Sequence, residues 1–138
     1  MRKERRRKYY RILPLYMSPE MLSGKKGGGY TWKSDVYSLG CVLYELAMLR
    51  APFKEPGMTF QALCKRVVRG DYQPLPKVFS REMRDLVDSM LDTEPENRID
   101  LAEICAVSAR NYEKYAKLKS ERREREGKAA DAGGKSKK

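Results

Sequence analysis

Histidine and closely spaced cysteines carry much of the acid–base, nucleophilic and metal chemistry of proteins, and this chain of 138 residues has neither. Without histidine there is no imidazole general base, no histidine-dependent catalytic triad and no histidine metal site. Cys41, Cys64 and Cys105 lie more than 20 residues apart, which excludes the C-x-x-C spacing of metal and redox sites. An odd, dispersed set of this kind is typical of reduced thiols in a cytosolic or nuclear protein.

Segment 24–29 (GKKGGG) is the stretch whose composition could cradle a phosphate group. A Walker A loop, however, needs the spacing G-x-x-x-x-G-K-[ST] between a strand and a helix. Here the spacing differs, and a single short turn at 20–23 comes before the glycines. Because glycine loses much backbone entropy in regular structure, we expect a flexible loop with no bound nucleotide.

The formal charge of +11 suggests a nucleic-acid or membrane-surface protein, but the excess lies entirely at the two ends. Segments 1–11 and 114–138 each carry a net charge of +6, whereas 12–113 carries −1. We therefore divide the chain into a basic tail (1–11), a helical domain (12–113) and a charged tail (114–138) that is helical at first and then disordered. No apolar run approaches the roughly 18 residues of a membrane span, and no signal peptide follows the charged start.

The elements that must position any site are predicted to be helices. Residues 36–49 (VYSLGCVLYELAML) contain only three non-apolar side chains, preceded by Ser34 as the expected N-cap and Asp35 in the first turn. A helix that is apolar nearly all round must be surrounded by protein, and fourteen residues are too few to cross a bilayer. This segment is the expected centre of a helical core.

Three amphipathic helices follow, each with apolar residues at i, i+3, i+4 spacing. Gly70 is expected to end the first and Ser80 to cap the second, while Asp100 and Glu103 stand at capping-box spacing before the third. Gly127 should stop the third helix, with 129–138 disordered. The predicted buried positions are Phe60, Leu63, Cys64, Val67 and Val68, then Met83, Leu86, Val87, Met90 and Leu91, then Leu101, Ile104, Cys105, Ser108 and Tyr112. The predicted fold is mainly α.

Three sequence blocks at long spacing carry a resemblance: PLYMSPE at 14–20, DVYSLG at 35–40 and PENR at 95–98. In this order they resemble the C-terminal lobe of a eukaryotic protein kinase, over about residues 13–112. They match the end of the activation segment, the start of the central buried helix and the loop before the last helix. The sequence YMSPE, followed by LGCVLYEL, most resembles the NIMA-related (Nek) serine/threonine kinases.

The resemblance implies roles for seven residues. Glu20 and Arg98 match a buried ion pair, in which removal of one partner typically costs about 3–5 kcal/mol; the alternative is two unrelated surface charges. Asp35 matches an aspartate that accepts backbone N–H groups of the catalytic loop, and its alternative is a helix-start residue stabilised by the dipole. In the family, one loop binds the substrate residue that follows the phosphorylated residue, and that loop is matched by Pro14, Leu15, Tyr16 and Met17. The alternative for these four residues is an unexposed turn packed on the central helix.

The same resemblance implies chemistry that these residues do not supply. Kinases use ATP and Mg²⁺, held by a Gly-rich loop, a strand lysine, an H-R-D loop and a D-F-G motif. The chain contains neither H-R-D nor D-F-G, and Ile12 and Leu13 replace the Gly-Thr expected before Pro14. We predict a truncated Nek-like domain without N-lobe or catalytic loop, with no catalytic residue, no metal ligand and no retained cofactor, inactive alone.

Two other functional classes remain open. One is a non-catalytic, pseudokinase-like scaffold, because a central helix without the family's neighbouring helix would expose an apolar face to a protein partner. The other is a basic-tailed protein that binds nucleic acid, microtubules or acidic lipid weakly through 1–11 and 114–138, although such runs are often only solvated tails. Either reading places the chain in the cytoplasm or nucleus.

Overall fold

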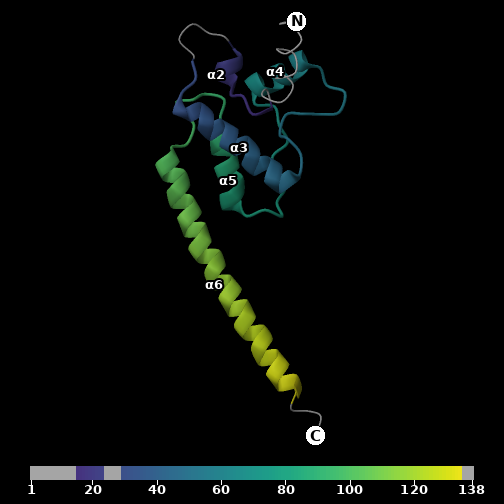
Figure 1. Cartoon of the computed structure of the whole chain (residues 1–138), viewed down its shortest axis with the longest axis vertical. Coiled ribbons are helices and arrows are strands. Elements are labelled where there is room, and N and C mark those ends of the chain that lie inside the picture. The colour runs from purple at the N-terminus through teal and green to yellow at the C-terminus, as the bar shows by residue number, and fades with distance from the viewer. Residues whose placement is uncertain (1–14, 24–28, 135–138) are drawn as a thin grey trace, which may run out of the picture. The chain divides into compact units, whose positions relative to one another are not determined.

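The computed structural model describes residues 15–23 and 29–134. Within these ranges the regular elements are helices, which confirms the predicted mainly α fold. The basic tail 1–11, Pro14 and most of the glycine-rich segment lie outside the described residues. The chain divides into two compact units, 1–101 and 102–138, and each is described by itself. The helices are α2 (Pro19–Leu22), α3 (Trp32–Met48), α4 (Phe60–Arg69), α5 (Arg81–Met90) and α6 (Leu101–Gly134) (Figure 1).

Helix α3 begins earlier than predicted. Its N-cap is Thr31, whose hydroxyl accepts the backbone N–H of Lys33 at 3.2 Å, while the Thr31 N–H donates to the Ser34 hydroxyl at 3.3 Å. Ser34 is therefore the second half of a capping box and not the N-cap itself. The prediction was wrong because both hydroxyls stand at capping positions, and the apolar run that pointed to Ser34 starts one turn inside the helix.

The core of the first unit is built on one face of α3. Tyr37, Cys41 and Tyr44 on that face are completely buried. The Tyr37 ring stacks on Phe53 with centroids 6.2 Å apart, and the Tyr44 hydroxyl donates to the Gln73 backbone carbonyl at 2.8 Å. These contacts bind the loops on either side of α4 to α3. The other buried members of the cluster are Leu63, Val67, Leu75, Val87 and Leu91.

The ends of α4 and α5 follow the sequence prediction. Gly70 caps α4 in the left-handed conformation with φ of 65°, a region that glycine enters without the Cβ clash of other residues. The Ser80 hydroxyl accepts the Met83 N–H at 3.2 Å and caps α5. On α4, Leu63 and Val67 are buried as predicted, whereas Phe60 and Val68 are exposed. The helix thus contributes a narrower stripe to the core than the sequence indicated.

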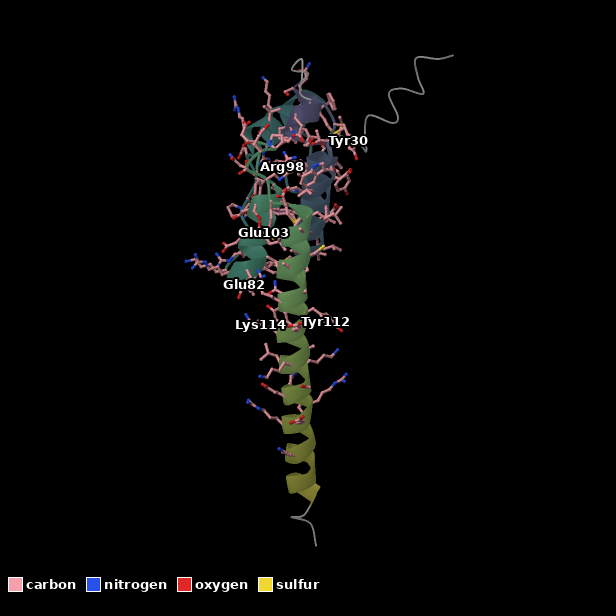
Figure 2. The ribbon with its side chains drawn as sticks, turned by 90° about the vertical axis from the view of Figure 1, so that its left-hand side faces the viewer. Tyr30, Glu82, Arg98, Glu103, Tyr112 and Lys114 are labelled. Carbon is pink, nitrogen blue, oxygen red and sulfur yellow. The ribbon has the colours of Figure 1, made fainter. Side chains whose placement is uncertain are left out.

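Helix α6 does not stop at Gly127 but continues to Gly134, so the expected end and the expected disorder of 129–134 are wrong. One glycine inside a helix costs only about 1 kcal/mol, and the surrounding residues are good helix formers with an Arg122–Glu126 ion pair at 2.7 Å. The predicted buried stripe is also wrong for most of its members, since Leu101, Cys105, Ser108 and Tyr112 are exposed and Ile104 is buried. Figure 2 shows the Tyr112 and Lys114 side chains projecting from this helix.

Among the described residues, no helix is both long enough and apolar enough to cross a membrane.

The packing of α3 on α5 leaves no room for a side chain at Gly40. A Cβ atom there would lie 2.8 Å from the Met90 Cβ, closer than real contacts allow, and 3.1 Å from Leu91 Cδ2, which is a tight contact. We expect Gly40→Ala to lower the free energy of unfolding by about 1–3 kcal/mol, because the overpacked helices must shift. Urea unfolding followed by circular dichroism measures this.

The matched control is Gly127→Ala in α6, where an added Cβ would meet nothing within 4 Å. Alanine there should leave stability unchanged or raise it slightly, because it is the better helix former. Equal stability of Gly40→Ala and the unmodified chain would contradict the close α3–α5 approach.

Candidate functional site

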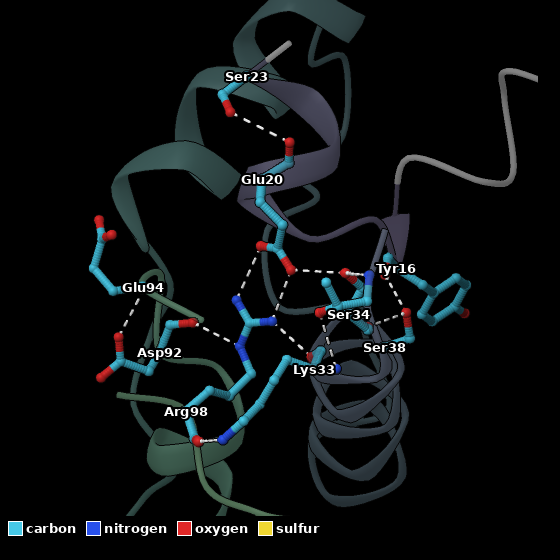
Figure 3. Close-up of polar contacts among 10 residues, drawn as sticks. Tyr16, Glu20, Ser23, Lys33, Ser34, Ser38, Asp92, Glu94 and Arg98 are labelled. Atoms are coloured by element: carbon cyan, nitrogen blue, oxygen red, sulfur yellow. Dashed lines mark hydrogen bonds and ion pairs between the residues drawn. The ribbon is translucent and has the colours of Figure 1, made fainter. Parts of the chain in front are cut away.

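The Glu20 and Arg98 side chains, 78 positions apart in the sequence, meet in a bidentate ion pair. Arg98 Nη1 donates to Glu20 Oε1 at 2.9 Å and Nη2 donates to Oε2 at 3.0 Å (Figure 3). The Arg98 side chain is completely buried and the Glu20 side chain is 9% exposed. The two parallel N–H···O bonds match the planar fork of a guanidinium to a carboxylate, which is the strongest form of such a pair. The alternative of two unrelated surface charges does not hold.

Arg98 also binds backbone oxygens from two further segments. Its Nε donates to the Asp92 carbonyl at 3.0 Å, and Nη1 donates to the Lys33 carbonyl at 2.6 Å. The guanidinium carbon lies 5.0 Å from the centre of the Tyr37 ring, a cation–π distance. One side chain thus links α2, the start of α3 and the loop before α6.

Around this pair, polar groups complete a small network. The Ser34 hydroxyl donates to Glu20 Oε1 at 2.8 Å, so the second residue of the capping box also binds the carboxylate. Lys33 Nζ donates to the Arg98 backbone carbonyl and pairs with Asp100 Oδ1 at 2.6 Å. The sequence cannot predict the contact of Lys33 with the Arg98 carbonyl, because every residue has a backbone carbonyl and none is marked as a partner.

The hydrogen bonds around Glu20 lower the pKa of its carboxyl group. Burial raises the pKa, but the hydrogen bonds from Arg98, from the backbone and from Ser34 outweigh burial and hold the pKa at about 2, below the ordinary 4.5. A carboxyl group this acidic stays ionised at neutral pH and has little tendency to take a proton. The pair is therefore a structural clamp and not a general acid or base.

The segment before α2 is held on α3 through Tyr16. The Tyr16 hydroxyl donates to Glu45 Oε2 at 2.6 Å, and the Ser38 hydroxyl donates to the Tyr16 carbonyl at 2.7 Å. The hydrogen bond to Glu45, burial and the Glu45 charge together raise the pKa of Tyr16. Leu15 and Tyr16 are half-buried against the core cluster, and Met17 is half-buried. Pro14, the first residue of this predicted binding loop, lies outside the described residues.

Asp35 lies exposed in the first turn of α3 and accepts a hydrogen bond from the Tyr30 hydroxyl. No pattern in the sequence points to Tyr30, which lies one residue before the Thr31 cap. Both readings of Asp35 place it at this helix start, and the structure adds one close polar partner. The structure brings Glu20 and Arg98 together and places Asp35 outside their network.

No group of three or more cysteine, aspartate and glutamate side chains in the described ranges is arranged to hold a metal ion.

Residues 1–108 match the family model described as the protein kinase domain. The chain belongs to the protein kinase family. Its Nek-like resemblance is confirmed by curated relatives. It is 42% identical over 91 residues to the probable serine/threonine-protein kinase nek3 of Dictyostelium discoideum, 44% over 85 residues to the serine/threonine-protein kinase Nek4 of Mus musculus, and 36% over 89 residues to the G2-specific protein kinase nimA of Emericella nidulans.

These alignments cover 66%, 62% and 64% of the chain but only 8%, 10% and 12% of the three kinases. The chain therefore spans about a tenth of the length of the relatives it matches. With the helical structure, the kinase match identifies the described fold as like a kinase C-terminal lobe. In that lobe the Glu20–Arg98 pair joins α2 to the loop before α6.

The lowered pKa of Glu20 predicts how the stability of this kinase unit depends on pH. A carboxyl group whose pKa is lower in the folded state stabilises the fold above its unfolded pKa, and this contribution is lost as pH falls toward the folded pKa. We therefore expect the stability difference between the unmodified chain and Glu20→Gln to be constant above about pH 5.5 and to shrink from about pH 4.5 to 2. Urea unfolding at a series of pH values measures it; a difference that does not change between pH 5 and 2 would show that Glu20 is not held as described.

Proposed function

We propose that this chain supplies the helical, substrate-binding side of a NIMA-related serine/threonine protein kinase. The reaction of that family is transfer of the γ-phosphate of ATP, with Mg²⁺, to a serine or threonine of a protein. The observation that carries the proposal is the buried Glu20–Arg98 pair, because it fixes α2 beside α3, directly after the segment 15–17 that Tyr16 holds on α3.

The proposed binding residues are Leu15, Tyr16 and Met17. Tyr16 is tied to α3 at both its hydroxyl and its carbonyl, which leaves the half-buried apolar side chains on either side in a fixed place. An apolar peptide residue gains free energy when it covers such surface, and a charged residue loses its hydration there. We propose that these residues accept an apolar residue next to the phosphorylated serine or threonine.

We further propose that the 138 residues alone transfer no phosphate. The resembled reaction needs a lysine and a glycine-rich loop for the nucleotide, an aspartate for the acceptor hydroxyl and another for Mg²⁺. The printed sequence holds neither the H-R-D nor the D-F-G motif that carries the two aspartates. Binding of peptide and transfer of phosphate are then separable properties.

One titration tests both properties of the kinase proposal. A short peptide with leucine after its serine is added to the isotope-labelled full chain with Mg-ATP, and the matched control peptide has aspartate in place of the leucine. We expect the leucine peptide to shift the NMR resonances of Leu15, Tyr16 and Met17 and the aspartate peptide to shift them at least about tenfold less at the same concentration, because the charge resists desolvation. Mass spectrometry of the same samples should show no phosphopeptide.

Equal shifts with both peptides would contradict the apolar binding site. Phosphate transfer above the level of a Glu20→Ala control would contradict the proposed inactivity of the 138 residues and would leave the binding result unaffected.

A further inference from the structure

Helix α4 has more apolar residues than the core of the first unit buries. Leu63 and Val67 lie in that core. Phe60 and Val68 are 52% and 43% exposed, and Cys64 between them is half-buried. Because these three side chains follow one another at intervals of four residues, they lie in one row along the helix. Phe60, Cys64 and Val68 form the apolar track of α4.

A row of basic side chains lies beside the apolar track. Lys65 and Arg69 are exposed, and each follows a member of the track by one residue. One residue corresponds to about 100° of rotation around a helix, so the two basic side chains lie on the solvent side of the track, away from the core. Helix α4 contains no acidic residue. Its outer surface is therefore apolar along one row and positively charged along the next.

The carboxylates that flank α4 in the sequence pair with Arg66. Arg66 Nη1 lies 2.6 Å from Glu55 Oε1, and Arg66 Nε lies 3.4 Å from Asp71 Oδ2. Among the described residues, no carboxylate pairs with Lys65 or Arg69. Exposed charges of one sign without a partner attract a ligand of the opposite sign and select against a ligand of the same sign.

Both rows are held in place before any ligand binds. The Thr59 hydroxyl accepts the Ala62 N–H at 3.2 Å at the start of α4, and Gly70 ends the helix. A helix fixed at both ends and by its buried side loses little conformational entropy when a ligand covers it. The track is also partly covered by the unit itself, whereas apolar side chains that enter a lipid surface are buried deeply in it. These features favour a peptide ligand over a membrane.

We propose that α4 binds an acidic amphipathic helix of a partner protein. The apolar side chains of that helix cover the apolar track, and its carboxylates pair with Lys65 and Arg69. A helix laid along α4 repeats its side chains at intervals of three to four residues, so its apolar row and its acidic row can match both rows of α4. The proposal goes beyond the kinase function and does not depend on it, because segment 15–17 takes no part in this contact.

A labelled synthetic peptide tests the proposal on the full 138-residue chain. The peptide has about 16 residues, with leucine at every fourth position, glutamate after each leucine and alanine elsewhere. Fluorescence anisotropy should give a Kd of about 10–100 µM, as expected for a small interface. The matched control peptide has lysine in place of each glutamate and should bind at least about tenfold more weakly, because its charges repel those of α4.

Charge reversal assigns the binding to α4. Lys65→Glu together with Arg69→Glu should weaken binding of the glutamate peptide at least about tenfold and should strengthen binding of the lysine peptide. The matched control is Lys119→Glu together with Arg123→Glu, which reverses two exposed charges at the same interval on α6. This control should bind the glutamate peptide within about twofold of the unmodified chain.

Truncation of an apolar side chain tests the other row. Phe60→Ala should weaken binding of the glutamate peptide at least about fivefold, whereas Val78→Ala, at a side chain 85% exposed outside α4, should not. Circular dichroism confirms that each variant stays folded.

Three results would overturn the proposal. Equal losses with the charge reversals on α4 and α6 would show that only net charge attracts the peptide. No binding of the glutamate peptide at about 1 mM would show that α4 is no site for an acidic helix. Binding of vesicles of phosphatidylserine and phosphatidylcholine that is lost with Phe60→Ala, without binding of the peptide, would assign the surface to lipid instead.

Discussion

The Arg98 guanidinium is sealed from solvent, so its charge is stable only while oxygens of the protein surround it. Those oxygens come from Glu20, from the Lys33 carbonyl at the start of α3 and from the Asp92 carbonyl. Three segments that share no regular hydrogen-bonding pattern are therefore held at fixed distances by one side chain. Because a buried charge without hydrogen-bond acceptors is costly, displacement of any one of these segments would leave the Arg98 guanidinium short of acceptors. The three segments therefore depend on one another.

From this clamp the other properties of the unit follow. With α2 fixed beside α3, the short segment 15–17 can rest on α3 through Tyr16 and present a defined apolar surface to a peptide. The aromatic core of Tyr37, Phe53 and Tyr72 fastens the loops around α4 to the same helix. Helix α3 is thus the common support of the core, of the clamp and of the proposed peptide-binding segment.

The sequence was sufficient for features that depend on residue type at short range, such as the Gly70 and Ser80 caps and the apolar face of α5. It paired Glu20 with Arg98 only through the motifs that flank them. It gave no indication of Tyr30 beside Asp35, nor of Lys33 between Arg98 and Asp100, because contacts to a backbone carbonyl or an exposed carboxylate leave no pattern in the sequence. The predicted end of α6 at Gly127 was wrong, because the helix-forming residues around this glycine offset its cost of about 1 kcal/mol.

A double-mutant cycle on Glu20 and Arg98 tests most directly whether the clamp holds the unit together. Urea unfolding of Glu20→Gln, Arg98→Met and the double variant gives the coupling between the two side chains. We expect the double variant to lose about 2–3 kcal/mol less than the sum of the single losses, because removal of both partners leaves no stranded charge. The exposed pair Arg81–Asp85 on α5, with its atoms 3.4 Å apart, should couple by less than about 1 kcal/mol. A Glu20–Arg98 coupling no larger than that of the exposed pair would contradict the central role of Arg98.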